Sequence, residues 1–194
     1  AMGSDDPAVD AELIQVFTEI ERRSAVRHTR LELNSIGDRE CRPAYVERLR
    51  AFLAERRDDL DDDTLRRAEV SPLRVFDTKN DAVRRALAEA PTACREHFEQ
   101  VQGFLTGYGV GFELVPTLVR GLDYYTRTVF EFVNEDLDAA QASICAGGRY
   151  DYLIEEIGGA PTPGVGWAAG VERMTVSSAA ALEPEVADLF VAFA

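Results

Sequence analysis

The sequence has little of the positive charge that a general nucleic-acid-binding protein needs. Its formal net charge at pH 7 is −14, and Lys79 is its only lysine. Broad, non-specific binding to nucleic acid requires a basic surface, so the composition argues against this function class. A local group of arginines that meets a phosphate backbone is still compatible with an acidic protein.

Long apolar runs and cysteine pairs are also missing. No run approaches the roughly 20 apolar residues of a transmembrane helix, and the N-terminus lacks the regions of a signal peptide. We therefore expect a cytoplasmic protein without a membrane partner. Cys41, Cys94 and Cys145 form no CxxC pair, and the only histidines are His28 and His97. This set argues against a structural zinc site, and an odd cysteine count favours thiols in a reducing compartment.

Apolar spacing predicts two elements at the start of the chain. Residues 10–22 place Ile14 and Phe17 on one helical face, and Asp10 is a suitable N-cap. Residues 29–33 alternate polar and apolar side chains, which is typical of a strand with one buried face.

Residues 38–95 differ from the segments around them, because arginine and aspartate dominate there. Helical spacing recurs at residues 45–53, and residues 81–90 form a second short helical pattern that ends near Pro91. The charged run at residues 56–63 is interpreted as a solvated helix end and loop. We predict a small helical module inserted into a larger domain.

After this module the pattern changes to β-structure. An amphipathic helix is predicted at residues 96–108, and shorter helices at residues 151–157 and 171–181. Strands rich in Val, Phe, Tyr and Thr are predicted at residues 111–115, 118–133 and 142–146, with a glycine-rich strand at 164–170. Strands that follow one another without crossover helices indicate an α+β fold with an antiparallel sheet.

Residues 118–131, LVRGLDYYTRTVFE, combine a cation with aromatic hydroxyl groups. Arg120 precedes Gly121, where the backbone can approach a ligand closely, and Tyr124 and Tyr125 offer rings with hydroxyl groups. In a regular strand the two rings point to opposite faces, but Gly121 can break that register. The alternative is that each tyrosine packs in the sheet with its hydroxyl at the edge.

Two further segments place glycines near arginine. In residues 146–151, AGGRYD, two glycines precede Arg149 and Tyr150, which suits either close contact with a small molecule or a turn into a helix. In residues 164–173, GVGWAAGVER, the glycine spacing fits neither a dinucleotide fingerprint nor a phosphate-binding P-loop. Its small residues clear a flat slot that suits an adenine, and Arg173 can reach a phosphate.

These three segments, in this order, resemble those of the histidyl-tRNA synthetases. LVRGLDYYTRTVFE, CAGGRYD and PTPGVGWAAGVERM are similar to the histidine-specific signatures and the third class-defining motif of that family. DPAVDAELI and LELNSIG are similar to segments after its second motif, and PLRVFDTKN to part of its helical insertion. The resemblance covers almost the whole chain, and the first signature is specific to this family within the class II synthetases.

The resemblance implies a division of the chain and a larger protein. Residues 1–37 and 96–183 correspond to the antiparallel class II catalytic core, with its histidine signatures and third motif. Residues 38–95 correspond to the helical insertion, and residues 184–194 to the start of the anticodon-binding domain. The first and second motifs would lie upstream of Ala1, so the chain is expected to be inactive alone. The full-length protein is expected to be a homodimer.

The resemblance also implies a reaction, in which L-histidine is activated with ATP and Mg²⁺ and then transferred to tRNA(His). Arg120 is the expected catalytic cation at the α-phosphate and also a histidine ligand. Tyr124, Tyr125 and Tyr150 are expected in the histidine pocket, and Arg173 at ATP. Further expected contacts are Gly164, Gly166 and Gly170 for ATP and Glu131 for the metal ion.

Tyr152 departs from the family pattern, since AGGRYD is usually followed by glycine. Its ring either narrows the site or points outward. Two other functions stay open: a regulatory subunit of histidine biosynthesis (a paralogue that regulates ATP phosphoribosyltransferase), and a synthetase-like tRNA sensor in a kinase. The presence of both Arg120 and Arg173 argues against the first, because a non-catalytic relative has less need of both.

Overall fold

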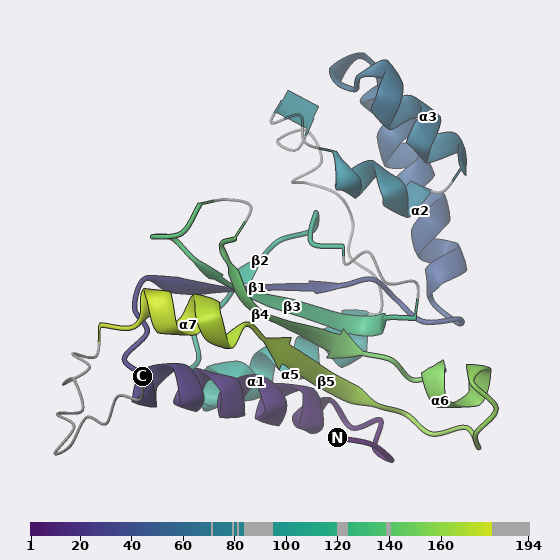
Figure 1. Cartoon of the computed structure of the whole chain (residues 1–194). Helices are drawn as coiled ribbons and strands as arrows, with labels where there is room; N and C mark the ends of the chain where they lie inside the picture. The colour runs from purple at the N-terminus through teal and green to yellow at the C-terminus, as the bar shows by residue number, and fades with distance from the viewer. Residues whose placement is uncertain are drawn as a thin grey trace, which may run out of the picture.

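The structure is a computed structural model that describes residues 1–70, 72–78, 80, 82–83, 95–119, 124–138 and 141–179. A five-stranded sheet in the order β2-β1-β3-β4-β5 forms its centre (Figure 1). The strands are β1 (Thr29–Ser35), β2 (Glu113–Leu114), β3 (Thr126–Asn134), β4 (Ser143–Arg149) and β5 (Val165–Ala169). Neighbouring strands are antiparallel except β1 and β2. The predicted α+β fold with an antiparallel sheet is confirmed.

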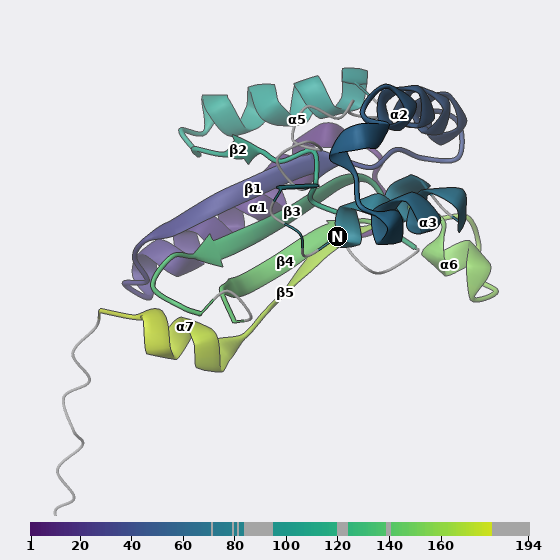
Figure 2. The same cartoon turned by 90° about the horizontal axis from the view of Figure 1, so that it is seen from above.

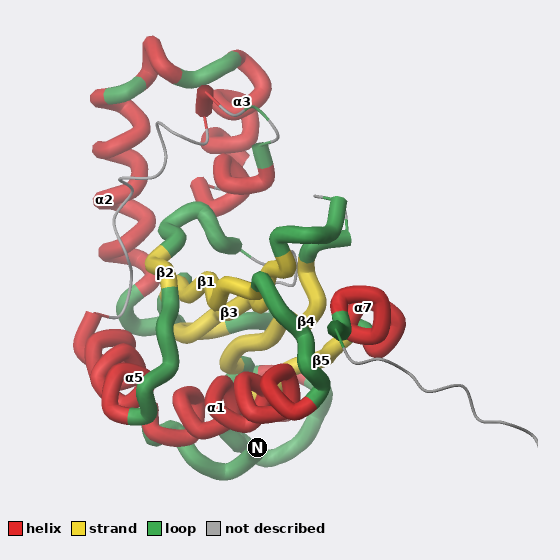
Figure 3. Tube along the Cα trace, turned by 90° about the vertical axis from the view of Figure 1, so that its left-hand side faces the viewer, coloured by secondary structure: helices red, strands yellow, loops and turns green. Residues whose placement is uncertain are grey.

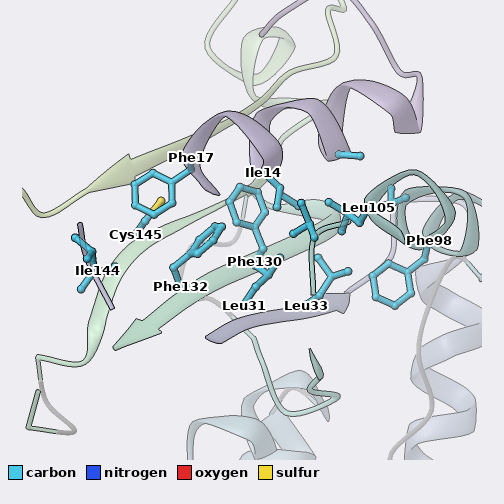
Figure 4. Close-up of a cluster of buried hydrophobic side chains, with 14 residues drawn as sticks. Ile14, Phe17, Leu31, Leu33, Phe98, Leu105, Phe130, Phe132, Ile144 and Cys145 are labelled. Atoms are coloured by element: carbon cyan, nitrogen blue, oxygen red, sulfur yellow. The ribbon is translucent and has the colours of Figure 1, made fainter. Parts of the chain in front are cut away.

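Two helices, α1 (Pro7–Arg23) and α5 (Arg95–Gly107), cover one face of this sheet (Figures 1 and 3). Ile14 and Phe17 from α1 pack against Phe130 and Phe132 of β3, and α5 adds Phe98 (Figure 4). Because side chains alternate along a strand, the residues between these apolar ones face the other side of the sheet. That other face is free of α1 and α5.

Two shorter helices flank the end strands. The helix α6 (Leu153–Glu156) follows β4, and α7 (Val171–Ser177) follows β5. Since β4 and β5 are antiparallel, these helices lie at opposite ends of the strand pair (Figure 2). The part of β4 and β5 that lies between α6 and α7 therefore has a helix at each end.

The predicted helical module stands apart from the sheet helices, on the opposite side of the sheet (Figure 3). It contains α2 (Arg42–Glu55), η1 (Arg57–Asp59), α3 (Asp62–Val70) and η2 (Pro72–Asp77). It has its own core, built on Tyr45, Leu49 and Val75, all at most 1% exposed. The charged run at residues 56–63 forms η1 and the first turn of α3. Most of the helix predicted at residues 81–90 lies outside the described residues.

Three local predictions were wrong. The N-cap of α1 is Asp6, whose Oδ1 accepts a hydrogen bond from the backbone N–H of Ala8 at 2.8 Å, while Asp10 is fully buried. The strand expected at residues 118–133 begins only at Thr126, so the two tyrosines lie before it. Cys41 is disulfide-bonded, where a thiol was expected, whereas Cys145 is a buried free thiol.

None of the helices found in the described residues is long and apolar enough to cross a membrane. Within the same part of the chain, no group of three or more His, Cys, Asp or Glu side chains gathers in a way that could hold a metal ion.

Candidate functional site

A cavity of about 700 Å³ lies along β4 and β5. Its floor contains Ala146 of β4 and Ala168 of β5, which are paired in the sheet and alternate with the apolar residues that face α1. The cavity therefore opens on the sheet face opposite α1 and α5. The other lining residues are Tyr124, Tyr125, Ser143, Ile144, Cys145, Tyr150, Leu153, Gly166, Trp167, Ala169, Gly170 and Arg173.

Three tyrosines from two distant segments meet at one end of this cavity. The ring centroids of Tyr124 and Tyr125 are 4.9 Å apart, and those of Tyr124 and Tyr150 are 6.3 Å apart in an edge-to-face arrangement. Tyr125 is 9% exposed and packs with Ile36 and Val129. Because Tyr124 and Tyr125 precede β3, strand alternation does not separate them, and both line the cavity.

The glycines of β4 and β5 make room for two of these rings. A Cβ on Gly148 would lie 2.9 Å from Cδ1 of Tyr125, and a Cβ on Gly164 would lie 2.5 Å from Cε2 of Tyr150. A Cβ on Gly166 would lie 3.0 Å from Oη of Tyr150. In AGGRYD the two glycines lie within β4 and not in a turn. The space above Gly148, Gly164 and Gly166 is thus occupied by tyrosine rings of the chain itself.

Arg173 lies at the other end of the cavity, on the first turn of α7. Its Nη1 donates a hydrogen bond to the carbonyl oxygen of Ser143 at 2.6 Å, which ties the side chain to β4. Its stem passes over Gly170, where a Cβ would lie 3.2 Å from Cδ of Arg173. The cavity therefore has aromatic hydroxyl groups at one end, a guanidinium at the other, and small residues between them.

Two other predicted site residues, Glu131 and Gly164, do not line this cavity. Arg120 lies outside the described residues. Glu131 is on the cavity face, because it pairs with Ala146 across β3 and β4, but it is half-buried one strand away. Gly164 lies behind Tyr150. Tyr152 is partly buried and does not line the cavity; the guanidinium carbon of Arg39 lies 3.9 Å from its ring centroid.

Beneath the tyrosines a charged network is closed off from solvent. Arg149 and Asp10 are both fully buried and are joined at 2.6 Å (Nη2 to Oδ1). Nη1 of Arg149 also donates to Oδ1 of Asp151 at 3.0 Å, and Oγ1 of Thr126 donates to Oδ2 of Asp151 at 3.1 Å. Burial alone would lower the pKa of Arg149, but the hydrogen bonds and charges of Asp10 and Asp151 raise it. The guanidinium is held permanently charged.

The same network reaches the helical module and α5. Nε of Arg127 donates to Oδ2 of Asp38 at 2.8 Å, and Oδ1 of Asp38 accepts the backbone N–H of Cys41 at 2.9 Å, at the start of α2. His97 of α5 has its Nε2 3.5 Å from Oδ2 of Asp10, but neither ring nitrogen makes a hydrogen bond within the described residues. Burial, opposed by Asp10, lowers the pKa of His97.

Several lining residues were not predicted as functional. Ser143, Ile144, Ala146, Leu153 and Ala168 contribute to the cavity mainly because of their position on β4, α6 and β5. The only sequence signal for these residues was the run of small residues in β5, and the predicted ATP contacts were attributed to the glycines of that run. The partners of Arg149 were also missed, because Asp10 is 139 residues away in sequence.

A sequence profile described as histidyl-tRNA synthetase matches residues 1–174. The chain belongs to the histidyl-tRNA synthetase family. A histidine–tRNA ligase from Streptomyces avermitilis is 49% identical over 97% of this chain and 45% of its own length. The apo histidyl-tRNA synthetase of S. aureus has a TM-score of 0.65 and 32% identity, over 91% of this chain and 45% of that one.

One structural neighbour has a double description, as an ATP phosphoribosyltransferase regulatory subunit/histidyl-tRNA synthetase from Bacillus halodurans. It has a TM-score of 0.61 and 19% identity, over 92% of this chain and 52% of that one, so it supports the shared fold alone. The chain spans about 45% of the length of the curated ligases that it matches.

Proposed function

We propose that the chain is part of a histidine–tRNA ligase and carries the pocket for the histidine side chain and one side of the ATP site. The observation that carries this proposal is the convergence of Tyr124, Tyr125 and Tyr150 in the cavity that ends at Arg173. The three rings come from the two segments that resemble the histidine signatures of the family. The sequence resemblance and the cavity geometry therefore both support this proposal.

In the proposed pocket the tyrosine hydroxyl groups hydrogen-bond the two imidazole nitrogens, and the rings determine the shape of the space. A site that is built to hydrogen-bond a substrate rejects an apolar analogue strongly, because its own polar groups would be left unpaired. Tyr125 is the most buried of the three. We expect its hydroxyl group to contribute most to discrimination, since a hydrogen bond is stronger in a desolvated environment than in water.

In the first proposed step a carboxylate oxygen of histidine attacks the α-phosphorus of ATP, and the bond to the bridging oxygen of pyrophosphate breaks. Negative charge grows on the phosphate oxygens, so fixed cations aimed at them lower the barrier. Arg173, anchored by its bond to Ser143, is the proposed ATP-binding cation. Arg120 remains the proposed catalytic cation at the α-phosphate. In the second step a terminal ribose hydroxyl of tRNA(His) attacks the histidyl carbonyl and releases AMP.

Gly166 and Gly170 line the cavity and stay proposed ATP contacts, although the Tyr150 hydroxyl lies over Gly166 and the Arg173 stem over Gly170, whereas Gly164 lies behind the Tyr150 ring. Mg²⁺ is proposed to arrive with ATP. Glu131 does not fit as a metal ligand on its own, because it lies outside the cavity lining and no acidic cluster accompanies it in the described part of the chain. No step is therefore assigned to a metal bound by these residues.

The remaining expectations belong to the same proposal. The family relatives are about twice as long as the chain, so the chain alone should lack part of the ATP clamp and be inactive. We propose a homodimer for the full-length protein and a cytoplasmic location. We also propose the division into a catalytic core (1–37 and 96–183), a helical insertion (38–95) and the start of a linker or anticodon-binding domain (184–194). The regulatory-subunit alternative is weaker, because the 49% identical relatives are ligases.

Histidine-dependent exchange of pyrophosphate into ATP tests this proposal in the full-length enzyme. We expect exchange that requires L-histidine and that is lost with histamine, which has no carboxylate to attack the phosphorus. Exchange that is absent, or that another amino acid supports equally well, would overturn the proposal.

A further inference from the structure

Arg149 is the largest fully buried side chain among the described residues, and it lies one residue before Tyr150 of the proposed histidine pocket. An arginine in a signature beside a pocket is ordinarily taken for a ligand of the substrate. Its surroundings here indicate a different role. Because no part of it reaches the cavity, it can act on a ligand only through other residues.

Every N–H group of this guanidinium already has an acceptor. An arginine side chain has five N–H donors. Nε and Nη2 bind the carboxylate of Asp10, Nη2 also reaches the carbonyl oxygen of Asp6, and Nη1 binds the carbonyl oxygen of Ser4 and the carboxylate of Asp151. No donor is left for a substrate, and a lysine could replace at most three of these bonds.

Asp151 connects this anchored arginine to both walls of the tyrosine pocket. It follows Tyr150 in the chain, and its Oδ2 accepts the hydroxyl of Thr126, the residue after Tyr125. The backbone N–H of Asp151 also donates to Oγ1 of Thr126 at 3.2 Å. The link is mostly buried, with Thr126 at 3% and the Asp151 side chain at 10% exposure. A short, desolvated chain of bonds therefore joins the segments that carry Tyr150 and Tyr125.

We propose that Arg149, held by Asp10, acts through Asp151 and Thr126 as a positioning residue that sets the separation of Tyr125 and Tyr150. The proposal deepens the proposed function, on whose histidine pocket it rests. Charge-assisted bonds in a dry environment tolerate little displacement. They add to the pairing of Thr126 with Arg149 between β3 and β4, and they hold Asp151 and the adjacent Tyr150 against the segment of Tyr125.

Two matched variants separate positioning from stability. Thr126→Val removes the hydroxyl between Asp151 and β3 and leaves all bonds of Arg149 in place. Thr128→Val makes the same change two residues further along β3, where the hydroxyl donates to Oδ2 of Asp10 at 2.8 Å. Thr128 is fully buried as well, so both variants lose one buried hydroxyl–carboxylate bond, and Thr126→Val also loses the bond from the backbone N–H of Asp151. Only the first variant removes the side-chain connection between the two tyrosine segments, whose strands stay paired.

In the full-length enzyme, Thr126→Val should raise KM for histidine about tenfold, the effect of roughly one lost hydrogen bond, with kcat changed much less. Thr128→Val should leave KM within about twofold, although its melting temperature falls by a similar amount. Equal effects of the two variants on KM, or no effect of Thr126→Val, would overturn the positioning role.

A measurement without ligand tests the positioning role separately from the proposed function. In the chain labelled at its tyrosine rings, Thr126→Val should shift the ring resonances of Tyr125 and Tyr150, and Thr128→Val should leave them in place. If wild-type enzyme shows no histidine-dependent exchange, the proposed function fails, and these resonances still decide the linkage. Unmoved resonances in folded Thr126→Val would refute it.

Discussion

The substitution Gly164→Ala tests whether histidine binding depends on the position that the Tyr150 ring has in the structure. The added Cβ would lie 2.5 Å from Cε2 and 2.9 Å from Cδ2 of that ring. Carbon atoms pack best at about 3.5–4.0 Å, so the ring has to retreat by about 1 Å. Overpacking of this kind costs roughly 1–3 kcal/mol of folding free energy. A displacement of about 1 Å at a binding site can reduce the rate by up to about 100-fold.

We therefore expect Gly164→Ala to raise KM for histidine by about 10- to 100-fold in pyrophosphate exchange. Gly103→Ala is the matched control, because nothing lies within 4 Å of its added Cβ in the middle of α5. It should raise stability by up to about 1 kcal/mol without changing KM. Val101→Ala, in the core under α5, controls for lost stability. A destabilised Gly164→Ala enzyme with normal KM would show that Tyr150 does not contact histidine.

Three further predictions concern single side chains. Tyr125→Phe should weaken histidine binding by roughly 3- to 100-fold in calorimetric titration, while the melting temperature barely moves. Tyr124→Phe should have the same effect only if the Tyr124 hydroxyl also binds the imidazole. A loss of stability with unchanged histidine affinity would show that these tyrosines have a structural role. Arg120→Lys should lower kcat more than it raises KM for histidine, since lysine keeps the charge but not the forked geometry, and a near-normal kcat would remove Arg120 from the transition state. Burial lowers the pKa of His97 below its usual 6.5, so the unfolded chain takes up the proton first and stability should fall as the pH drops below 6.5. Thermal melts of His97→Gln should show a shallower fall, and an equal slope would contradict this assignment.

Much of the fold could be predicted from periodicity. The helical spacing around Ile14 and Phe17 predicted α1, and the alternation at residues 29–33 predicted β1. The sequence predicted the wrong N-cap for this helix, because two aspartates were candidates for that position. Asp10 looked like a cap, but Asp6 followed by Pro7 provides the stronger start, because proline suits the first helical position.

The candidate site was predictable in its residue types but not in its geometry. Tyrosine and valine favour strands, so residues 118–125 were assigned to a strand that in fact begins at Thr126. The glycines indicated that another group lies close to the backbone, but the sequence did not show that this group is the ring of Tyr125 or Tyr150. Arg149 and Asp10 are joined only by tertiary structure, and no local pattern indicates a pair so far apart in sequence.

The most direct test of the pocket follows all six tyrosine rings of the chain during a titration with L-histidine. Tyr124, Tyr125 and Tyr150 line the cavity, whereas Tyr45, Tyr108 and Tyr152 do not and serve as internal controls. With tyrosine-labelled chain and histidine in the millimolar range, the account predicts that the first three ring resonances shift together and saturate with one affinity, while the other three stay in place. Saturable binding that shifts the control tyrosines, or that leaves the three cavity tyrosines unmoved, would contradict the account.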